Sequence, residues 1–190
     1  MAIRLQNAPE RAAQSISAAL QALRAMPVKP FPLPAEAAGL LHHPHTIFHA
    51  GLEDLVTGRG LSSAKPVSWA YLVGANGTAA AIAEVTYDGQ ELSQLNQGPF
   101  AAGILNTLTR AESAKEIKEG DFEFNILRIP GIYLLALWLK DLKGGAHVFI
   151  PVPPAPRELE AGKSYSEEEF LEIARMLAAR ALPTNPPPLV

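Results

Sequence analysis

The spacing of apolar residues changes along the chain, and each spacing predicts a different kind of element. Near the N-terminus the apolar positions recur every three or four residues, as in an amphipathic helix: Ala12, Ile16, Leu20 and Leu23. Asn7 can cap this helix, with Glu10 completing a capping box and Pro9 in the first turn, where proline is tolerated. We therefore expect a first helix that begins after Asn7 and ends by Pro27.

In the centre of the chain the pattern changes to the two-residue alternation of strands. Residues Val67–Val73 place valine or aromatic side chains at every second position, which predicts a strand. Asn76 and Gly77 follow, and this pair is a strong hairpin signal. The return strand, Ala79–Tyr87, contains four alanines, which are weak strand formers, so we expect another element to pack closely against it.

The second half of the chain predicts two helices and three strands. Pro130 and Gly131 suit a type II turn, and Ser166 with Glu169 forms a capping box. A continuously apolar run in this half is typical of a strand that is covered on both faces. The expected elements are a helix at 99–118, strands at 122–126, 132–139 and 147–152, and a helix that begins after Ser166.

Together these elements predict a single-domain α+β fold. Short hairpin links favour a mainly antiparallel sheet of about five strands, in the order β-β-α-β-β-β, with flanking helices. This order is similar to the roadblock/longin and profilin-like arrangement. The analogy rests on the order of elements alone, and no sequence motif supports it. The expected organisation is an N-terminal helix at 1–26, a proline-rich strap and irregular helical segment at 27–60, an α+β core at 61–182 and a flexible tail at 183–190.

The segment between the first helix and the first strand has no regular pattern. Residues 27–34 contain four prolines, which exclude a helix or a central strand and leave an extended strap or a stiff spacer. Phe31 and Leu33 favour the strap, because a free linker is usually more polar. Residues 35–41 can form a short helix, and residues 45–56 can form a second one.

Charge excludes one class of function. The 190 residues include 16 basic and 19 acidic side chains, with a net charge of −3 and no run of basic residues. Nucleic-acid-binding proteins usually carry a basic patch, because phosphate neutralisation supplies much of their affinity. We therefore expect no nucleic-acid partner.

Compartment and redox chemistry follow from the apolar runs and the cysteine count. The longest apolar run, from Ile132 to Leu139, is far shorter than the ~20 residues of a membrane span, and the N-terminus lacks a signal-peptide pattern. We expect no membrane association and a cytoplasmic location, with leaderless secretion as the alternative. The absence of cysteine excludes disulfides, thiolate metal sites and cysteine nucleophiles.

The one concentration of reactive side chains is rich in histidine. Four of the five histidines lie between His42 and His49. On a helix, His45 and His49 would stand one turn apart, with Glu53 one turn further. Two imidazoles and a carboxylate can hold a divalent metal such as zinc, with His42 or His43 as further ligands. The pattern is not His-Glu-x-x-His, and we favour the alternative that these histidines lie on a surface loop and a polar helix start.

Other catalytic patterns are missing from the sequence. No serine lies in Gly-x-Ser-x-Gly, and no glycine-rich phosphate loop is present. Asp88 and Glu91 suit a solvated turn better than an acid–base pair. Arg128 and Lys140 are single charges near strand ends, which we interpret as solvation of the sheet end.

We therefore expect a non-catalytic protein-binding or assembly module, with a protein partner or self-association and no cofactor. The 17 prolines supply extended segments that a partner groove can bind, although such segments also stiffen connections. A homodimer formed through a helix or a sheet edge is the simplest version. The alternatives are a metal-binding protein or metal-dependent enzyme that uses histidines 42–49, and a small-molecule sensor with a pocket between the sheet and the helices.

Overall fold

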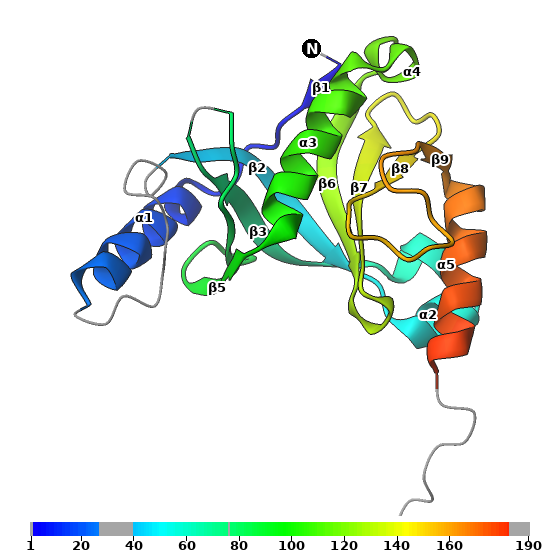
Figure 1. Ribbon diagram of the computed structural model, residues 1–190, viewed down its shortest axis with the longest axis horizontal. Coiled ribbons are helices and arrows are strands. Elements are labelled where there is room, and N and C mark those ends of the chain that lie inside the picture. The colour runs from blue at the N-terminus through cyan, green and yellow to red at the C-terminus, as the bar shows by residue number, and fades with distance from the viewer. Residues whose placement is uncertain (1, 27–39, 76, 183–190) are drawn as a thin grey trace, which may run out of the picture.

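A computed structural model describes residues 2–26, 40–75 and 77–182, which form an α+β fold around one sheet of nine strands (Figure 1). The strands are β1 (Ile3–Arg4), β2 (Leu41–His49), β3 (Lys65–Val73), β4 (Ala81–Thr86), β5 (Leu92–Gln97), β6 (Phe122–Ile129), β7 (Leu134–Asp141), β8 (Val148–Pro151) and β9 (Tyr165–Ser166). The helices are α1 (Glu10–Ala25), α2 (Leu52–Val56), α3 (Pro99–Ser113), α4 (Lys115–Lys118) and α5 (Glu167–Ala181), with 3-10 turns η1 (Gly60–Ser63) and η2 (Pro130–Ile132).

The sheet is mainly antiparallel, in the order β5-β4-β3-β2-β6-β7-β8-β9. Two pairings are parallel: β2 with β6, and the short β1, which also pairs with β6. The parallel neighbours are far apart in sequence, as parallel pairing requires a long connection. Strand β6 therefore lies at the middle of the fold and joins the N-terminal hairpins to the C-terminal ones.

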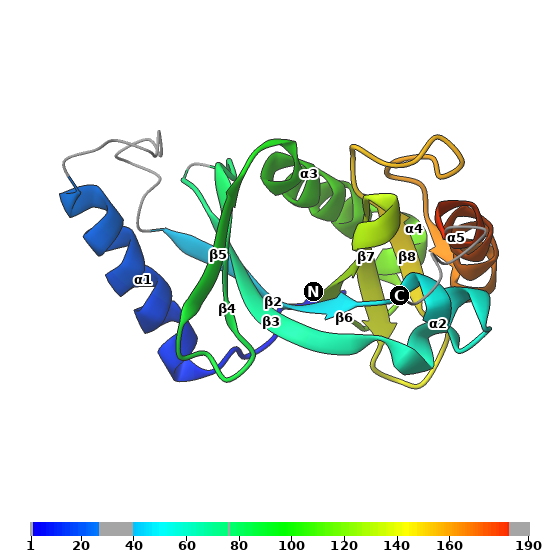
Figure 2. The ribbon, with the colours of Figure 1, turned by 90° about the horizontal axis from the view of Figure 1, so that it is seen from below.

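The sheet is strongly curved, and helices cover both of its sides (Figure 2). Helix α3 lies in the concave side, whereas α1 packs outside β3, β4 and β5, and α5 with α2 packs outside β7 and β8 (Figures 1 and 2). On the concave side, Leu72, Ile82 and Ile126 share one apolar cluster with Ile104 and Leu108 of α3. This curvature produces the hollow that contains the candidate site.

The alanine-rich strand β4 has the close neighbour that its composition predicts. Ala81 and Ala83 lie in the cluster under α1, together with Ile16 and Leu20 of that helix. Small side chains allow the helix to approach the sheet, and the packing stabilises a segment with weak intrinsic strand preference. The final helix is also confirmed, because Ser166 Oγ accepts from the Glu169 amide at 3.3 Å and the Glu169 carboxylate accepts from the Ser166 amide at 3.0 Å.

The α+β class is confirmed, but the sheet has nine strands, more than the five or so that the sequence predicted. Strands β1 and β9 contain two residues each, too few for a recognisable alternation. Strand β5 reads Leu-Ser-Gln-Leu-Asn-Gln and is largely exposed, so its sequence resembles a polar loop. Strand β2 lies where a helix was expected.

The prediction of a helix at 45–56 is wrong. Residues up to His49 belong to β2, and only Leu52–Val56 is helical. Phe48 and Leu52 have helical spacing, but both pack against the same apolar cluster from different elements. Pairing with β3 on one side and β6 on the other satisfies the backbone of β2 and overrides the local pattern.

Three boundaries also differ from the expected ones. Helix α1 begins at Glu10 with Pro9 as its N-cap, and no side-chain cap is formed. The helix expected to reach residue 118 breaks at Ala114, where the backbone is extended. Pro130 and Gly131 begin a 3-10 turn instead of a type II turn.

Several predictions lie outside the described residues. These are the strap at 27–34, nearly all of the short helix at 35–41 and the tail at 183–190. Within the described parts of the chain, none of the helices has the length and apolar content to cross a membrane.

Candidate binding pocket on the concave face

A pocket of about 330 Å³ opens on the concave face, between β5, the start of α3 and the turn η2. Its walls are mostly apolar, and among the described residues that line it Arg128 is the one that carries a charge. The lining residues are Ile82, Gln94, Asn96, Gln97, Gly98, Phe100, Ala101, Arg128, Pro130, Tyr133, Leu134 and Leu135. Ligand sites typically occupy roughly 300–1,000 Å³, so this pocket suits one small ligand or one large side chain.

A tight turn at Gly98 positions two walls of the pocket. Gly98, between β5 and α3, has φ of 136°, in a region that favours glycine. This turn brings Phe100 and Ala101 of α3 opposite Gln94 and Asn96 of β5 across the pocket. One apolar wall is thus built from the start of α3, and the polar wall opposite it from the exposed strand β5.

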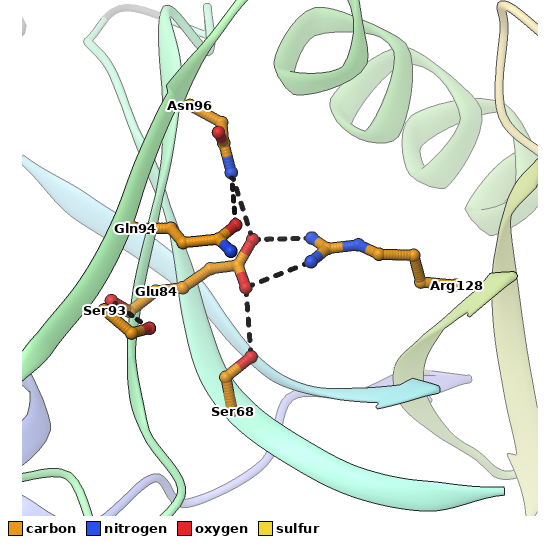
Figure 3. Close-up of polar contacts among 6 residues, drawn as sticks. All are labelled: Ser68, Glu84, Ser93, Gln94, Asn96 and Arg128. Atoms are coloured by element: carbon orange, nitrogen blue, oxygen red, sulfur yellow. Dashed lines mark hydrogen bonds and ion pairs between the residues drawn. The ribbon is translucent and has the colours of Figure 1, made fainter. Parts of the chain in front are cut away.

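A buried ion pair between Glu84 of β4 and Arg128 of β6 forms the polar floor (Figure 3). Arg128 Nη2 donates to Glu84 Oε1 at 2.5 Å, and Nη1 donates to Oε2 at 3.2 Å. The Glu84 side chain is 3% exposed and that of Arg128 is 18% exposed, so the guanidinium is the side of the pair that faces the pocket. The two strands are separated by β3 and β2, and the curvature of the sheet lets the side chains meet.

Further hydrogen bonds satisfy the remaining capacity of the Glu84 carboxylate (Figure 3). Ser68 Oγ donates to Oε2 at 3.1 Å, and Asn96 Nδ2 donates to Oε1 at 3.3 Å. Asn96 Nδ2 also donates to Gln94 Oε1 at 3.0 Å, which connects the pair to the exposed wall of the pocket. A carboxylate held by this many donors is a structural acceptor and is poorly placed to abstract a proton.

The ion pair makes the floor of the pocket polar but electrically neutral. A guanidinium has five N–H donors, and the bonds to Glu84 leave others that can serve an acceptor in the pocket. Because Arg128 is already neutralised, an anionic group would meet the nearby negative charge of Glu84 as well. The arrangement suits an uncharged, mainly apolar group that carries a hydrogen-bond acceptor.

Tyr133, which lines the pocket, is unusual in its exposure and in its backbone conformation. The residue is 86% exposed, and its φ of 52° lies in the left-handed region that costs a non-glycine residue about 1–2 kcal/mol. Backbone strain of this kind concentrates at ligand sites and other functional segments. Because the exposed ring of Tyr133 makes no contribution to the core, we interpret it as a candidate contact for a ligand or partner at the pocket.

The structure places His45 and His49 on a strand instead of a helix. Residues four apart on a strand are about 13 Å apart, compared with about 6 Å on a helix, so the two imidazoles cannot share one metal ion. His45 is fully buried, with its ring 4.7 Å from that of Phe124. Its Nδ1 lies 2.7 Å from the His43 carbonyl oxygen and donates to it, and burial lowers the pKa of His45 to about 4.

His49 is partly buried next to Arg128 in the register of β2 and β6. Burial lowers its pKa, and the positive charge of Arg128 lowers the pKa further. Glu53 is exposed on α2. Throughout the described residues, no group of three or more His, Asp or Glu side chains is placed to hold a metal ion.

His42 and His43 are the two histidines that do lie together. Their Nδ1 atoms are 2.6 Å apart, and His43 has a φ of 54°, in the left-handed region. Burial lowers the pKa of both, and for His42 the charge of His43 adds to the effect.

The residues of the pocket floor were missed or misinterpreted from the sequence. Arg128 does not solvate the end of the sheet, because it is paired with Glu84 across the concave face. Lys140 places its Nζ 4.1 Å from the ring centre of Phe48, a contact with an aromatic face. The available signal was Glu84, whose neighbours from Ala81 to Val85 are all apolar, because a charge that is buried with such neighbours needs a partner.

Comparison with known proteins adds no family assignment: no protein-family model, no curated protein and no solved structure matches this chain.

Proposed function

We propose that this protein is a non-catalytic binding module whose concave pocket receives an uncharged, mainly apolar group from a protein partner. The observation that carries the proposal is the combination of apolar walls with the charge-neutral Glu84–Arg128 floor. Both oxygens of Glu84 are engaged, which supports a structural role for this carboxylate. Tyr133 supports a protein partner, because exposed tyrosines beside a pocket are typical of interface hot spots.

A small-molecule ligand is the second candidate. It is favoured by the volume of the pocket and by the side-chain amides of Gln94 and Asn96, which converge with Arg128 on one side. The same chemistry applies to both candidates, so the experiment has to identify the occupant by its mass.

The test is photo-crosslinking in cells that express the protein, with a benzophenone amino acid at position 133. We expect a covalent adduct with a defined partner protein, identified by mass spectrometry. Gln94→Trp places a large ring in the pocket and should abolish the adduct, because Gln94 lines the pocket and is exposed. Gln90→Trp is the matched control, since Gln90 is equally a glutamine but lies in the exposed turn before β5.

Three results discriminate between the candidates. An adduct that disappears with Gln94→Trp and persists with Gln90→Trp supports a protein partner in the pocket. A small-mass adduct with the same dependence supports the small-molecule candidate. An adduct that both variants retain, or no adduct at all, contradicts the proposal.

A further inference from the structure

The polar wall of the pocket carries a chain of hydrogen bonds with a fixed direction (Figure 3). The chain begins at the Glu84 carboxylate, which Ser68 and Arg128 contact from two other strands. An ionised carboxylate can only accept hydrogen bonds, so the Asn96 atom that lies 3.3 Å from Glu84 Oε1 has to be the amide nitrogen. The charge of Glu84 therefore determines which way the side chain of Asn96 is turned.

The same direction passes from Asn96 to Gln94. Asn96 Nδ2 also donates to Gln94 Oε1 at 3.0 Å, so both of its N–H groups are used. Asn96 then offers an occupant of the pocket the acceptor Oδ1, and Gln94 offers the donor Nε2. Within the described residues, neither of these two atoms takes part in a hydrogen bond. Both side chains line the pocket and are exposed, so an occupant can reach them.

Arg128 adds further donors to the same pocket. Its bonds to Glu84 use one N–H on each terminal nitrogen and leave the others for an occupant. The pocket thus presents donors from Gln94 and Arg128 and an acceptor from Asn96, next to apolar walls.

A group that complements this pattern needs an acceptor and a donor close together, and no charge. A carboxamide carries both, the C=O and the N–H, on one planar unit. A ketone has the acceptor but leaves Asn96 Oδ1 without a donor, which costs affinity. A carboxylate also lacks the N–H, and it brings a second negative charge near Glu84.

We propose that the pocket recognises a carboxamide on an apolar body, and that the protein partner supplies it as the peptide group beside an apolar side chain. The side chain fills the space next to Phe100 and Leu134, the C=O accepts from Gln94 or Arg128, and the N–H donates to Asn96 Oδ1. This inference rests on the proposed function, because it specifies the polar end of the group that the partner inserts.

The test is an NMR titration of the ¹⁵N-labelled, untagged chain with three matched probes: benzamide, acetophenone and benzoate. The probes share a phenyl ring and differ in one group, because the NH₂ of benzamide is replaced by CH₃ in acetophenone and by O⁻ in benzoate. We expect benzamide to bind about twofold to tenfold more tightly than acetophenone, the effect of one hydrogen bond. Benzoate should bind more weakly than either.

Two variants assign this preference to a residue. Asn96→Leu removes the acceptor, so the affinities for benzamide and acetophenone should become equal. Gln97→Leu is the matched control, because Gln97 also lines the pocket but belongs to no hydrogen bond of the chain within the described residues. Its carboxamide can turn to suit either probe, so its loss should leave the preference unchanged. The order of the three probes in the wild type tests the proposal even if a variant fails to fold.

The outcomes separate this inference from the proposed function. A wild type that does not bind benzamide, or binds acetophenone or benzoate as tightly, overturns the carboxamide specificity, as does a preference lost equally in Gln97→Leu. A partner adduct at position 133 without a preference for benzamide keeps the proposed function and rejects this inference. A preference for benzamide without an adduct supports the carboxamide specificity and rejects a protein partner as its source.

Discussion

Removal of one partner of the Glu84–Arg128 pair tests whether the pocket floor is held by compensated charges. In Arg128→Met the apolar stem is kept and the guanidinium is lost. The Glu84 carboxylate, 3% exposed, is then left in the interior without its counter-charge. Breaking a buried pair in this way costs about 3–5 kcal/mol, because an uncompensated charge remains.

The double variant separates this penalty from the intrinsic value of the pair. Glu84→Gln combined with Arg128→Met removes both charges, while Ser68 can still donate to the amide oxygen that replaces the carboxylate. We expect the free energy of unfolding of the double variant to lie within about 2 kcal/mol of the wild-type value, and the double variant to be more stable than Arg128→Met alone. Urea denaturation of the four proteins gives the free energies of unfolding and the coupling between the two sites. If Arg128→Met loses under 1 kcal/mol, or if the double variant loses as much as the sum of the single ones, the reasoning is refuted.

Two further predictions concern His45 and Tyr133. The pKa of His45 is about 4 in the folded protein and about 6.5 in the unfolded chain, so its contribution to stability is complete above the unfolded value and is lost as the pH falls between the two. When the pH is lowered from about 7 to about 5, the free energy of unfolding of the wild type, measured by urea denaturation, should therefore fall by about 2 kcal/mol more than that of His45→Leu. Equal losses in the two proteins would contradict the assignment. Tyr133→Asn places a residue that tolerates left-handed backbone at φ 52° and should raise the free energy of unfolding by up to about 1 kcal/mol; a loss of more than 1 kcal/mol in the same measurement would show that the tyrosine ring supports the fold.

The sequence allowed prediction of the elements whose own residues carry a strong pattern. Strand β3 has valine or aromatic side chains at every second position from Val67 to Val73, and α5 begins with Ser166 and Glu169 in a complete capping box. Strands β2 and β5 have weaker local signals, and both depend on their neighbours in the sheet. The backbone pairing of β2 with β3 and β6 decides its conformation, although Phe48 and Leu52 have the spacing of a helix.

The candidate pocket could not be predicted for a related reason. Glu84 and Arg128 are 44 residues apart, and each alone resembles an ordinary polar residue near the end of a strand. Only the curvature of the sheet, which is a property of all its strands together, brings the two side chains into contact over β3 and β2. The histidines show the converse: they are close in sequence, but the period of a strand separates His45 from His49. A cluster in the sequence predicts a site only when the conformation of the backbone is known, and a charge among apolar neighbours predicts that it is paired when buried but not which residue pairs with it.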